Sequence, residues 1–185
     1  MQNTIAINRK NILSKALITL IAVAGAVILP QIFHGIGTIS GTGPAMGSAL
    51  LPMHIPVLLA GFLGGPLVGA AAGVLSPLVS SAVSGMPSAL ILPFMVLELG
   101  VYGLVSGLLS RRNINSLAAL LLTQLIGRAV RAAAVLAAVL ILGNEQLTIA
   151  SAYSFVLEGL FGILLQWALI PPLTKQLKEL VKKHD

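Results

Sequence analysis

The chain has 185 residues, of which 57% are hydrophobic and only 9% are charged, and its formal net charge is +6. Soluble domains carry about a quarter charged residues, so this composition excludes a water-facing surface and predicts an integral membrane protein. There is no cysteine in the sequence, which excludes disulfides and thiolate metal sites.

Six apolar runs follow one another along the chain, and each is predicted to be a membrane-spanning helix. Backbone polar groups must be paired within lipid, and about 20 helical residues cross the hydrocarbon layer. In chain order the runs are residues 12–33, 49–64, 67–83, 89–109, 117–142 and 149–173. The first run is long and has no good cleavage site after it, so we interpret it as a retained helix rather than a signal peptide. Residues 1–185 are therefore predicted to form a single transmembrane domain.

The second and third runs are short, and they are joined by Gly64-Gly65-Pro66, which leaves no room for a loop. A re-entrant hairpin is the alternative interpretation of this pair. Two full crossings are favoured, because only an even number of spans keeps the basic residues of the chain together on one side.

Basic residues are placed on one side of the predicted bundle. Nine of the eleven lie at the two ends of the chain or in one central pair: Arg9, Lys10, Lys15, Arg111, Arg112, Lys175, Lys178, Lys182 and Lys183. With six spans all nine share one side, and the loops on the other side carry only Glu145. Membrane proteins retain Lys and Arg in the cytoplasm, so we predict an all-α, six-helix transmembrane bundle with both termini cytoplasmic. Nucleic acid is not an expected partner, because no basic face carries aromatic residues.

The segment 34–49, HGIGTISGTGPAMGSA, is the longest uncharged stretch predicted on the outer side. Its glycine, serine and threonine content makes it flexible and able to form hydrogen bonds. Two interpretations stay open: a connecting loop, or a lid that closes an outward-facing pocket. The absence of charge favours the lid.

Four ionisable residues lie inside the apolar runs: Glu98, Arg128, Arg131 and Glu158. Each costs at least about 2.5 kcal/mol to place at the bilayer centre, so such residues normally face a partner or a wet cavity. Counting the helical rise from the outer ends of the spans places all four at similar depth. They are predicted to form either interhelical salt bridges or a polar pocket that holds a solute.

Several further side chains are candidates for that pocket. Polar or stacking contacts are available from Gln124, Gln166, Trp167 and Tyr153. Arg128 and Arg131 are three residues apart, so they share a helix face, and their repulsion favours a common acidic partner or an anionic ligand group. His54, early in the second run, is either a ligand contact or a hydrogen-bonded structural residue. We assign Arg128 to the ligand and Arg131 to an ion pair.

Motifs for catalysis, metal binding and nucleotide binding are missing from the sequence. It contains no HExxH, the only aspartate is Asp185, and His34, His54 and His184 are too dispersed for a metal triad. A phosphate-binding loop is also missing. We therefore expect no enzyme activity, no metal and no cofactor, and no transport driven by the chain's own ATP hydrolysis.

Small residues are frequent in the first apolar run. Ala22 and Ala26 are four apart, a spacing that allows another helix to approach closely. Packing inside the bundle and docking to another subunit are both compatible with this step.

Three parts of the sequence resemble the substrate-binding S components of energy-coupling factor (ECF) transporters. They are LPQIFH at 29–34, LPMHIPVLLAGFLGGPLVGAAAGVLSPLVSSAVSGMP at 51–87, and Gly127-Arg128. The resemblance implies a six-span subunit of a bacterial plasma membrane that binds a vitamin or related micronutrient from outside. It also implies two kinds of partner, a transmembrane coupling protein and two cytoplasmic ATPases, with Ala22 and Ala26 as candidates for docking to the coupling protein. It does not supply the identity of the vitamin.

Two other classes of function remain as alternatives. A self-sufficient secondary carrier would use the buried charges as a proton relay, although the chain is small and has no intramembrane aspartate. A membrane scaffold protein would bind no solute, which leaves the lid-like segment and the buried arginines without a role.

Overall fold

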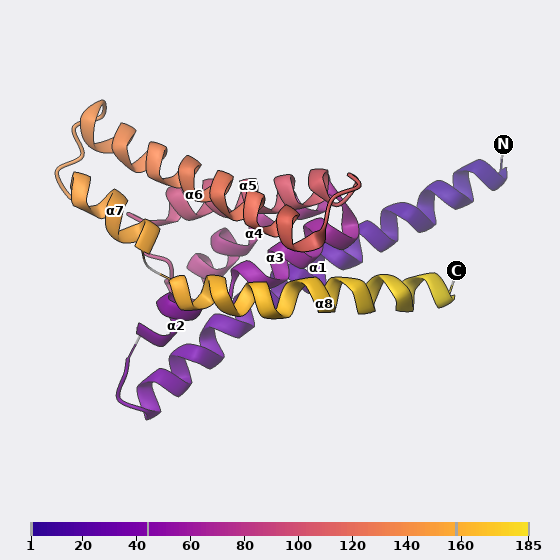
Figure 1. Ribbon diagram of the computed structural model, residues 1–185, viewed down its shortest axis with the longest axis horizontal. Helices are drawn as coiled ribbons and strands as arrows, with labels where there is room; N and C mark the ends of the chain where they lie inside the picture. The colour runs from indigo at the N-terminus through magenta and orange to yellow at the C-terminus, as the bar shows by residue number, and fades with distance from the viewer. Residues whose placement is uncertain (1, 44, 158, 185) are drawn as a thin grey trace.

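The computed structural model describes residues 2–43, 45–157 and 159–184, without the side chains of 2–10, 45, 46, 48, 155, 156 and 181–184. All regular secondary structure in these residues is helical. The helices are α1 (Gln2–Ile39), α2 (Ala45–Leu50), α3 (His54–Gly64), α4 (Pro66–Ser84), α5 (Leu92–Leu109), α6 (Ser116–Leu140), α7 (Ile149–Leu157) and α8 (Leu160–His184) (Figure 1).

Four of these helices are long and apolar enough to cross a membrane: Asn11–Ile39 of α1, α4, α5 and α6. Helix α3 is apolar but shorter. The prediction of an all-helical membrane protein is therefore confirmed, whereas six crossings and cytoplasmic termini stay predictions.

Two of the predicted spans are interrupted. The run predicted at 49–64 is divided into α2 and α3 at Leu51, whose φ of 49° is left-handed. The run predicted at 149–173 is divided into α7 and α8, and Gly159 beside the break has a φ of 77°. Helix α8 also continues beyond residue 173 into the basic tail.

The segment 34–49, expected to be a flexible loop, is largely helical. Helix α1 continues to Ile39, and its end is closed by Gly43 N–H and the Thr42 hydroxyl, which donate to the Gly37 carbonyl at 2.9 and 3.4 Å. Helix α2 then packs back onto α1, because Gly47 leaves space for the ring of His34. Only a short turn around residues 40–43 therefore separates two packed helices.

Helices α3, α4 and α5 approach one another along a line of glycines. This glycine seam consists of Gly61, Gly69, Gly73, Gly103 and Gly107. A Cβ on Gly69 would overlap the carbonyl of Gly103, and a Cβ on Gly103 would overlap that of Gly69. The other three meet neighbouring backbone or side-chain atoms in the same way. Contact between backbones, which small residues allow in membrane helices, fixes the centre of the bundle.

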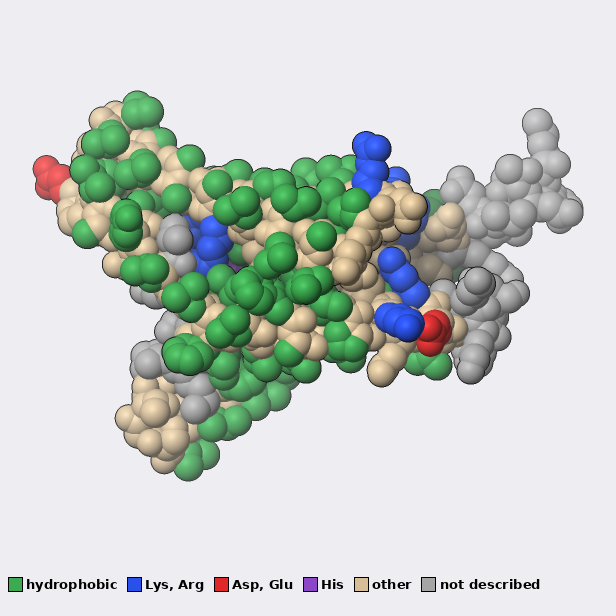
Figure 2. All heavy atoms as spheres, in the orientation of Figure 1, with side chains coloured by type: hydrophobic (Ala, Val, Ile, Leu, Met, Phe, Trp, Pro, Cys, Tyr) green, Lys and Arg blue, Asp and Glu red, His purple; other side chains and the backbone are tan. Residues whose placement is uncertain are grey.

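The distribution of side chains is the reverse of that in a soluble protein. Large apolar side chains are exposed along the helices, as Leu20, Leu67, Leu125 and Phe161 illustrate, and they cover the outer surface (Figure 2). Charged and amide side chains are instead among the buried residues. This arrangement suits a bilayer, whose hydrocarbon contacts the apolar surface.

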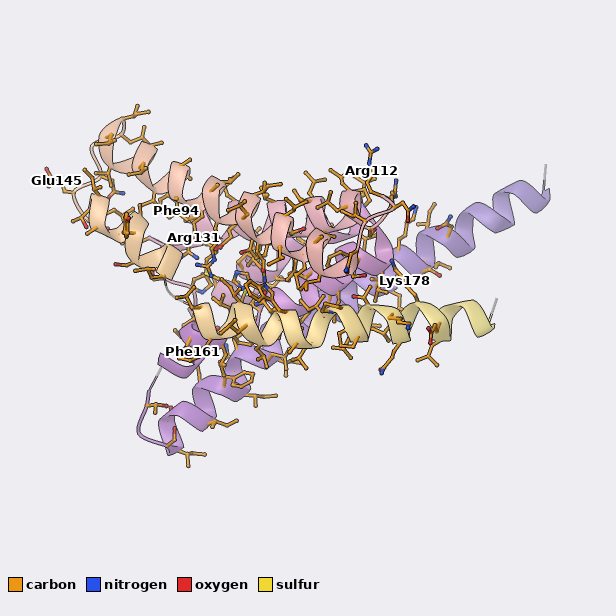
Figure 3. The ribbon with its side chains drawn as sticks, viewed as in Figure 1. Phe94, Arg112, Arg131, Glu145, Phe161 and Lys178 are labelled. Carbon is orange, nitrogen blue, oxygen red and sulfur yellow. The ribbon has the colours of Figure 1, made fainter. Side chains whose placement is uncertain are left out.

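The two ends of the molecule differ in charge. Figure 1 shows that both chain termini lie at one end, and Figure 3 places Arg112 and Lys178 there and Glu145 at the other. We call the first the basic end, defined by Arg111, Arg112, Lys175 and Lys178. The turn between α3 and α4 also lies there, since a Cβ on Gly65 would be 2.8 Å from Arg111 Nη2.

The opposite end separates into two arms (Figure 1). One arm is the last part of α1 with α2, and the other is the last part of α6 with α7. The second arm is held by an apolar cluster in which Phe94 of α5 packs with Val135 and Ala138 of α6 and Ala152 of α7. The arms diverge from the glycine seam, and Figure 2 shows a recess in the outline of the molecule between them.

Candidate functional site

A buried group of ionisable side chains, Glu98, Arg131 and His54, joins three helices. Arg131 of α6 donates from Nη1 to Oε2 of Glu98 on α5 at 2.6 Å, and the Glu98 side chain is completely buried. His54 at the start of α3 is buried as well, with Nε2 3.8 Å from the same carboxylate oxygen. One carboxylate therefore faces a guanidinium and an imidazole from different helices.

Tyr102 extends this cluster, although it was not singled out from the sequence. Its ring packs edge-on against His54, with ring centroids 5.2 Å apart, and its hydroxyl donates to the backbone carbonyl of Gln124 at 3.5 Å. A Cβ on Gly127 would overlap the Tyr102 ring, so Gly127 makes the space that the ring fills. The available signal was spacing, because Tyr102 is four residues after Glu98 and so shares its helix face.

A second chain of hydrogen bonds links α6 to α8. Gln124 donates from Nε2 to Gln166 Oε1 at 2.8 Å, and Trp167 donates from Nε1 to Gln124 Oε1 at 2.6 Å. Gln124 and Gln166 are buried, whereas Trp167 is partly exposed. Both ends of the Gln124 amide are thus used to hold α8 against α6.

Arg128 lies between these two groups. It is buried on α6, one helical turn after Gln124 and three residues before Arg131. It is within interaction range of the Tyr102 hydroxyl and the Glu98 carboxylate. We call His54, Glu98, Tyr102, Gln124, Arg128, Arg131, Gln166 and Trp167 the polar cluster.

Of the other residues predicted from the sequence, Glu158 lies outside the described residues. Tyr153 on α7 is exposed. The structure therefore brings together five of the predicted residues on α3, α5 and α6 with Gln166 and Trp167 on α8, and it adds Tyr102.

Ala22 and Ala26 lie on the inner face of α1. Ala22 packs with Ala60 of α3 and Ala72 of α4, and Ala26 packs with Met53 and Leu99. Both are buried, so in this arrangement the small-residue step serves contact inside the bundle.

The polar cluster retains unused capacity for hydrogen bonds. Within the described part of the chain, Glu98 Oε1, Gln166 Nε2 and both ring nitrogens of His54 are buried without a hydrogen-bond partner. Buried polar groups are normally satisfied, so such atoms mark a place where water or a ligand completes the network. Figure 2 shows basic atoms at the surface between α6, α7 and the start of α8, and Figure 3 places Arg131 there.

The arrangement is suited to binding rather than to chemistry. It offers both cationic and amide groups to a small polar molecule. The donors and acceptors come from four helices, so a bound molecule would hold those helices together.

Comparison with known proteins gives one match. The sequence model of the family described as ECF transporter, substrate-specific component, matches residues 11–174. Neither the curated proteins nor the solved structures contain a match to this chain. The matched range runs from the first apolar helix to α8 and includes every residue of the polar cluster.

Proposed function

Because the chain belongs to the family of ECF transporter substrate-specific components, we propose that it is the high-affinity binding subunit for a vitamin or related micronutrient. Family membership itself makes the chain a multi-pass membrane protein that binds a substrate for transport and associates with other ECF components. It is a transport-binding subunit and not an enzyme.

The proposed topology has six crossings and both termini in the cytoplasm of a bacterial cell. The six are α1, α2 with α3, α4, α5, α6, and α7 with α8, all within one transmembrane domain. The clustering of basic residues at the end that holds both termini supports it, since such residues are retained inside. A reporter placed near Arg112 should read cytoplasmic and one near Gln146 external; a cytoplasmic signal near Gln146 would contradict six crossings.

The proposed substrate site is the polar cluster. In this proposal Arg131 forms an ion pair with Glu98, and the ligand contacts six side chains: Arg128, Glu98, Gln124, His54, Trp167 and Glu158. The observation that carries this proposal is the set of buried polar atoms of the cluster, on Glu98, Gln166 and His54, that have no hydrogen-bond partner. We propose that residues 34–49 close the recess between the two arms, and the packing of α2 against α1 and against Gly162 of α8 supports a lid that moves as a helical unit.

The first experiment asks whether a ligand is present and where it binds. Native mass spectrometry of the mildly purified protein should reveal a co-purifying small molecule. Arg128→Ala should then weaken binding of that molecule several-fold or more, with the melting temperature little changed. Arg112→Ala, which removes an exposed arginine at the basic end, is the matched control and should leave affinity unchanged. Unchanged affinity in Arg128→Ala with a clearly lower melting temperature would refute the assignment.

Uptake is proposed to depend on an ECF coupling protein and two cytoplasmic ATPases. The absence of a phosphate-binding loop in the sequence supports this dependence. Because Ala22 and Ala26 are buried against α3 and α4, docking through them would require α1 to separate from those helices. Concentrative uptake in cells lacking the ECF ATPases would overturn the dependence.

A further inference from the structure

A groove lies at the basic end of the bundle, apart from the polar cluster. It is formed by the start of α6 and the second half of α8, and it measures about 530 Å³. Its lining includes Asn115, Ser116, Pro171, Thr174, Lys175 and Lys178. The groove therefore joins two helices at the level where the lysines of α8 begin.

Thr174 lines this groove, and its hydroxyl oxygen is buried. The residue is only 2% exposed, and its Oγ1 has no hydrogen-bond partner in the part of the chain that is described. Hydroxyls in membrane helices usually bond the carbonyl four residues earlier. The Ser76 and Thr123 hydroxyls both do so, at 2.6 and 2.7 Å. The unused Thr174 hydroxyl thus points to a polar atom that is supplied from outside the chain.

The charges around the groove select an anion. Lys175 and Lys178 are three residues apart, so they extend from the same side of α8, and both are exposed. On the facing element, Asn115 accepts the Leu117 N–H through its side chain and the Ala119 N–H through its backbone carbonyl, both at 2.9 Å. The amides of Ser116 and Ala118, at the start of α6, have no acceptor within the helix. The positive helix terminus and two lysines together outweigh Glu179 on the same rim.

The apolar part of the groove selects an anion that carries acyl chains. Pro171 and Pro172 contribute apolar lining, and large apolar residues in the adjoining turns, Leu117 and Leu169, are exposed. We propose that this groove binds the phosphate headgroup of an anionic phospholipid from the adjacent leaflet, with its acyl chains along α6 and α8. Basic pockets between membrane helices bind such headgroups.

The test uses the whole protein in nanodiscs made from an equimolar mixture of phosphatidylglycerol and phosphatidylcholine. Lipids retained after transfer to detergent are counted by native mass spectrometry. The unchanged protein should retain phosphatidylglycerol in preference to phosphatidylcholine. K175Q/K178Q should lower that preference by about 25-fold, at about fivefold for each lysine. Thr174→Val, which removes only the hydroxyl, should lower it by a smaller factor.

The matched control is R111Q/R112Q, which removes two charges from the same end without altering the groove. It should retain most of the preference. An equal loss in this control would mean that general surface charge attracts the lipid, and would overturn the proposal. So would the absence of any preference in the unchanged protein.

Inorganic phosphate at millimolar concentration distinguishes a headgroup from a free anion. It should not displace the retained lipid, since it lacks the acyl chains. Displacement by phosphate alone would assign the groove to a free anion and refute the lipid. Because none of these residues belongs to the polar cluster, the result is independent of the proposed substrate site.

Discussion

The glycine seam and the polar cluster share helix α5 but stabilise the bundle by different means. In the seam, Gly103 brings the backbone of α5 into direct contact with that of α4. In the cluster, Glu98 and Tyr102 of the same helix contact α6 and α3 through an ion pair and a ring contact. The first region is closed by contact between backbones, and the second by side chains whose hydrogen bonds are incomplete.

Residues of the seam therefore determine how the helices pack, whereas residues of the cluster are available for binding. In the seam any added atom meets backbone, so its residues are fixed by packing and have no room for a ligand. Buried charges and amides cost free energy to place in a membrane, and the cluster retains them with polar atoms unused. Substitutions in the seam should therefore affect folding alone, whereas those in the cluster should affect stability and binding in different proportions.

The largest loss of stability is expected from a substitution in the glycine seam. Gly103→Leu places a side chain where the Gly69 carbonyl lies, and because backbone must move, the loss of stability should exceed about 3 kcal/mol. We expect no monodisperse protein by size-exclusion chromatography. Gly35→Leu is the control, since a Cβ there meets nothing within 4 Å. A melting temperature for Gly103→Leu close to that of Gly35→Leu would contradict the tight seam.

In the cluster, Glu98→Ala should have the next largest effect. It leaves Arg131 buried without its carboxylate, and breaking a buried pair in this way costs about 3–5 kcal/mol. Adding Arg131→Met should recover much of that loss, because the remaining charge is then removed as well. Melting temperatures of both single variants and the double variant measure the coupling. Additive losses would show that the two residues do not act as a pair.

The sequence was sufficient to predict the class of fold, an all-helical membrane protein. The predictions from apolar runs and from the placement of lysines and arginines rest on many residues, so a local irregularity in one helix does not change them. The breaks at Leu51 and Gly159 are local backbone events with no such signal, and two predicted spans were consequently drawn as continuous. Helix α1 was predicted to end too early, because glycines suggested a loop where the Thr42 hydroxyl and Gly43 N–H cap a helix.

The polar cluster was predictable only in part. Charges in apolar runs identified Glu98, Arg128 and Arg131, but Tyr102 resembles any aromatic residue in a membrane helix until its neighbours are known. The seam did leave a pattern, since Gly69 and Gly73 are four apart, as are Gly103 and Gly107. The same spacing in the first run, Ala22 and Ala26, also lies at a contact between helices.

Gly127 combines features of both regions, because it is a glycine required by close packing but its neighbour is Tyr102 of the polar cluster. Gly127→Ala would place its Cβ in the Tyr102 ring, and overpacking of this kind costs about 1–3 kcal/mol. Tyr102→Leu in the same protein should relieve the overlap, so the double variant should melt higher than the sum of the single effects predicts. If the two losses simply add, the ring is not what requires a glycine there.

The smallest effect is expected at Trp167, on the exposed edge of the cluster. Trp167→Phe keeps an aromatic ring but removes the 2.6 Å hydrogen bond to Gln124 Oε1, and a neutral hydrogen bond contributes about 0.5–1.5 kcal/mol. Because the residue is partly exposed, the change in melting temperature should fall at the low end of that range. Ligand affinity is the more informative measurement, since Gln124 and Trp167 are both proposed to contact the ligand. If the loss of binding free energy is greater than the loss of unfolding free energy, Trp167 belongs to the binding site. If the two losses are equal, Trp167 serves only the packing of the helices.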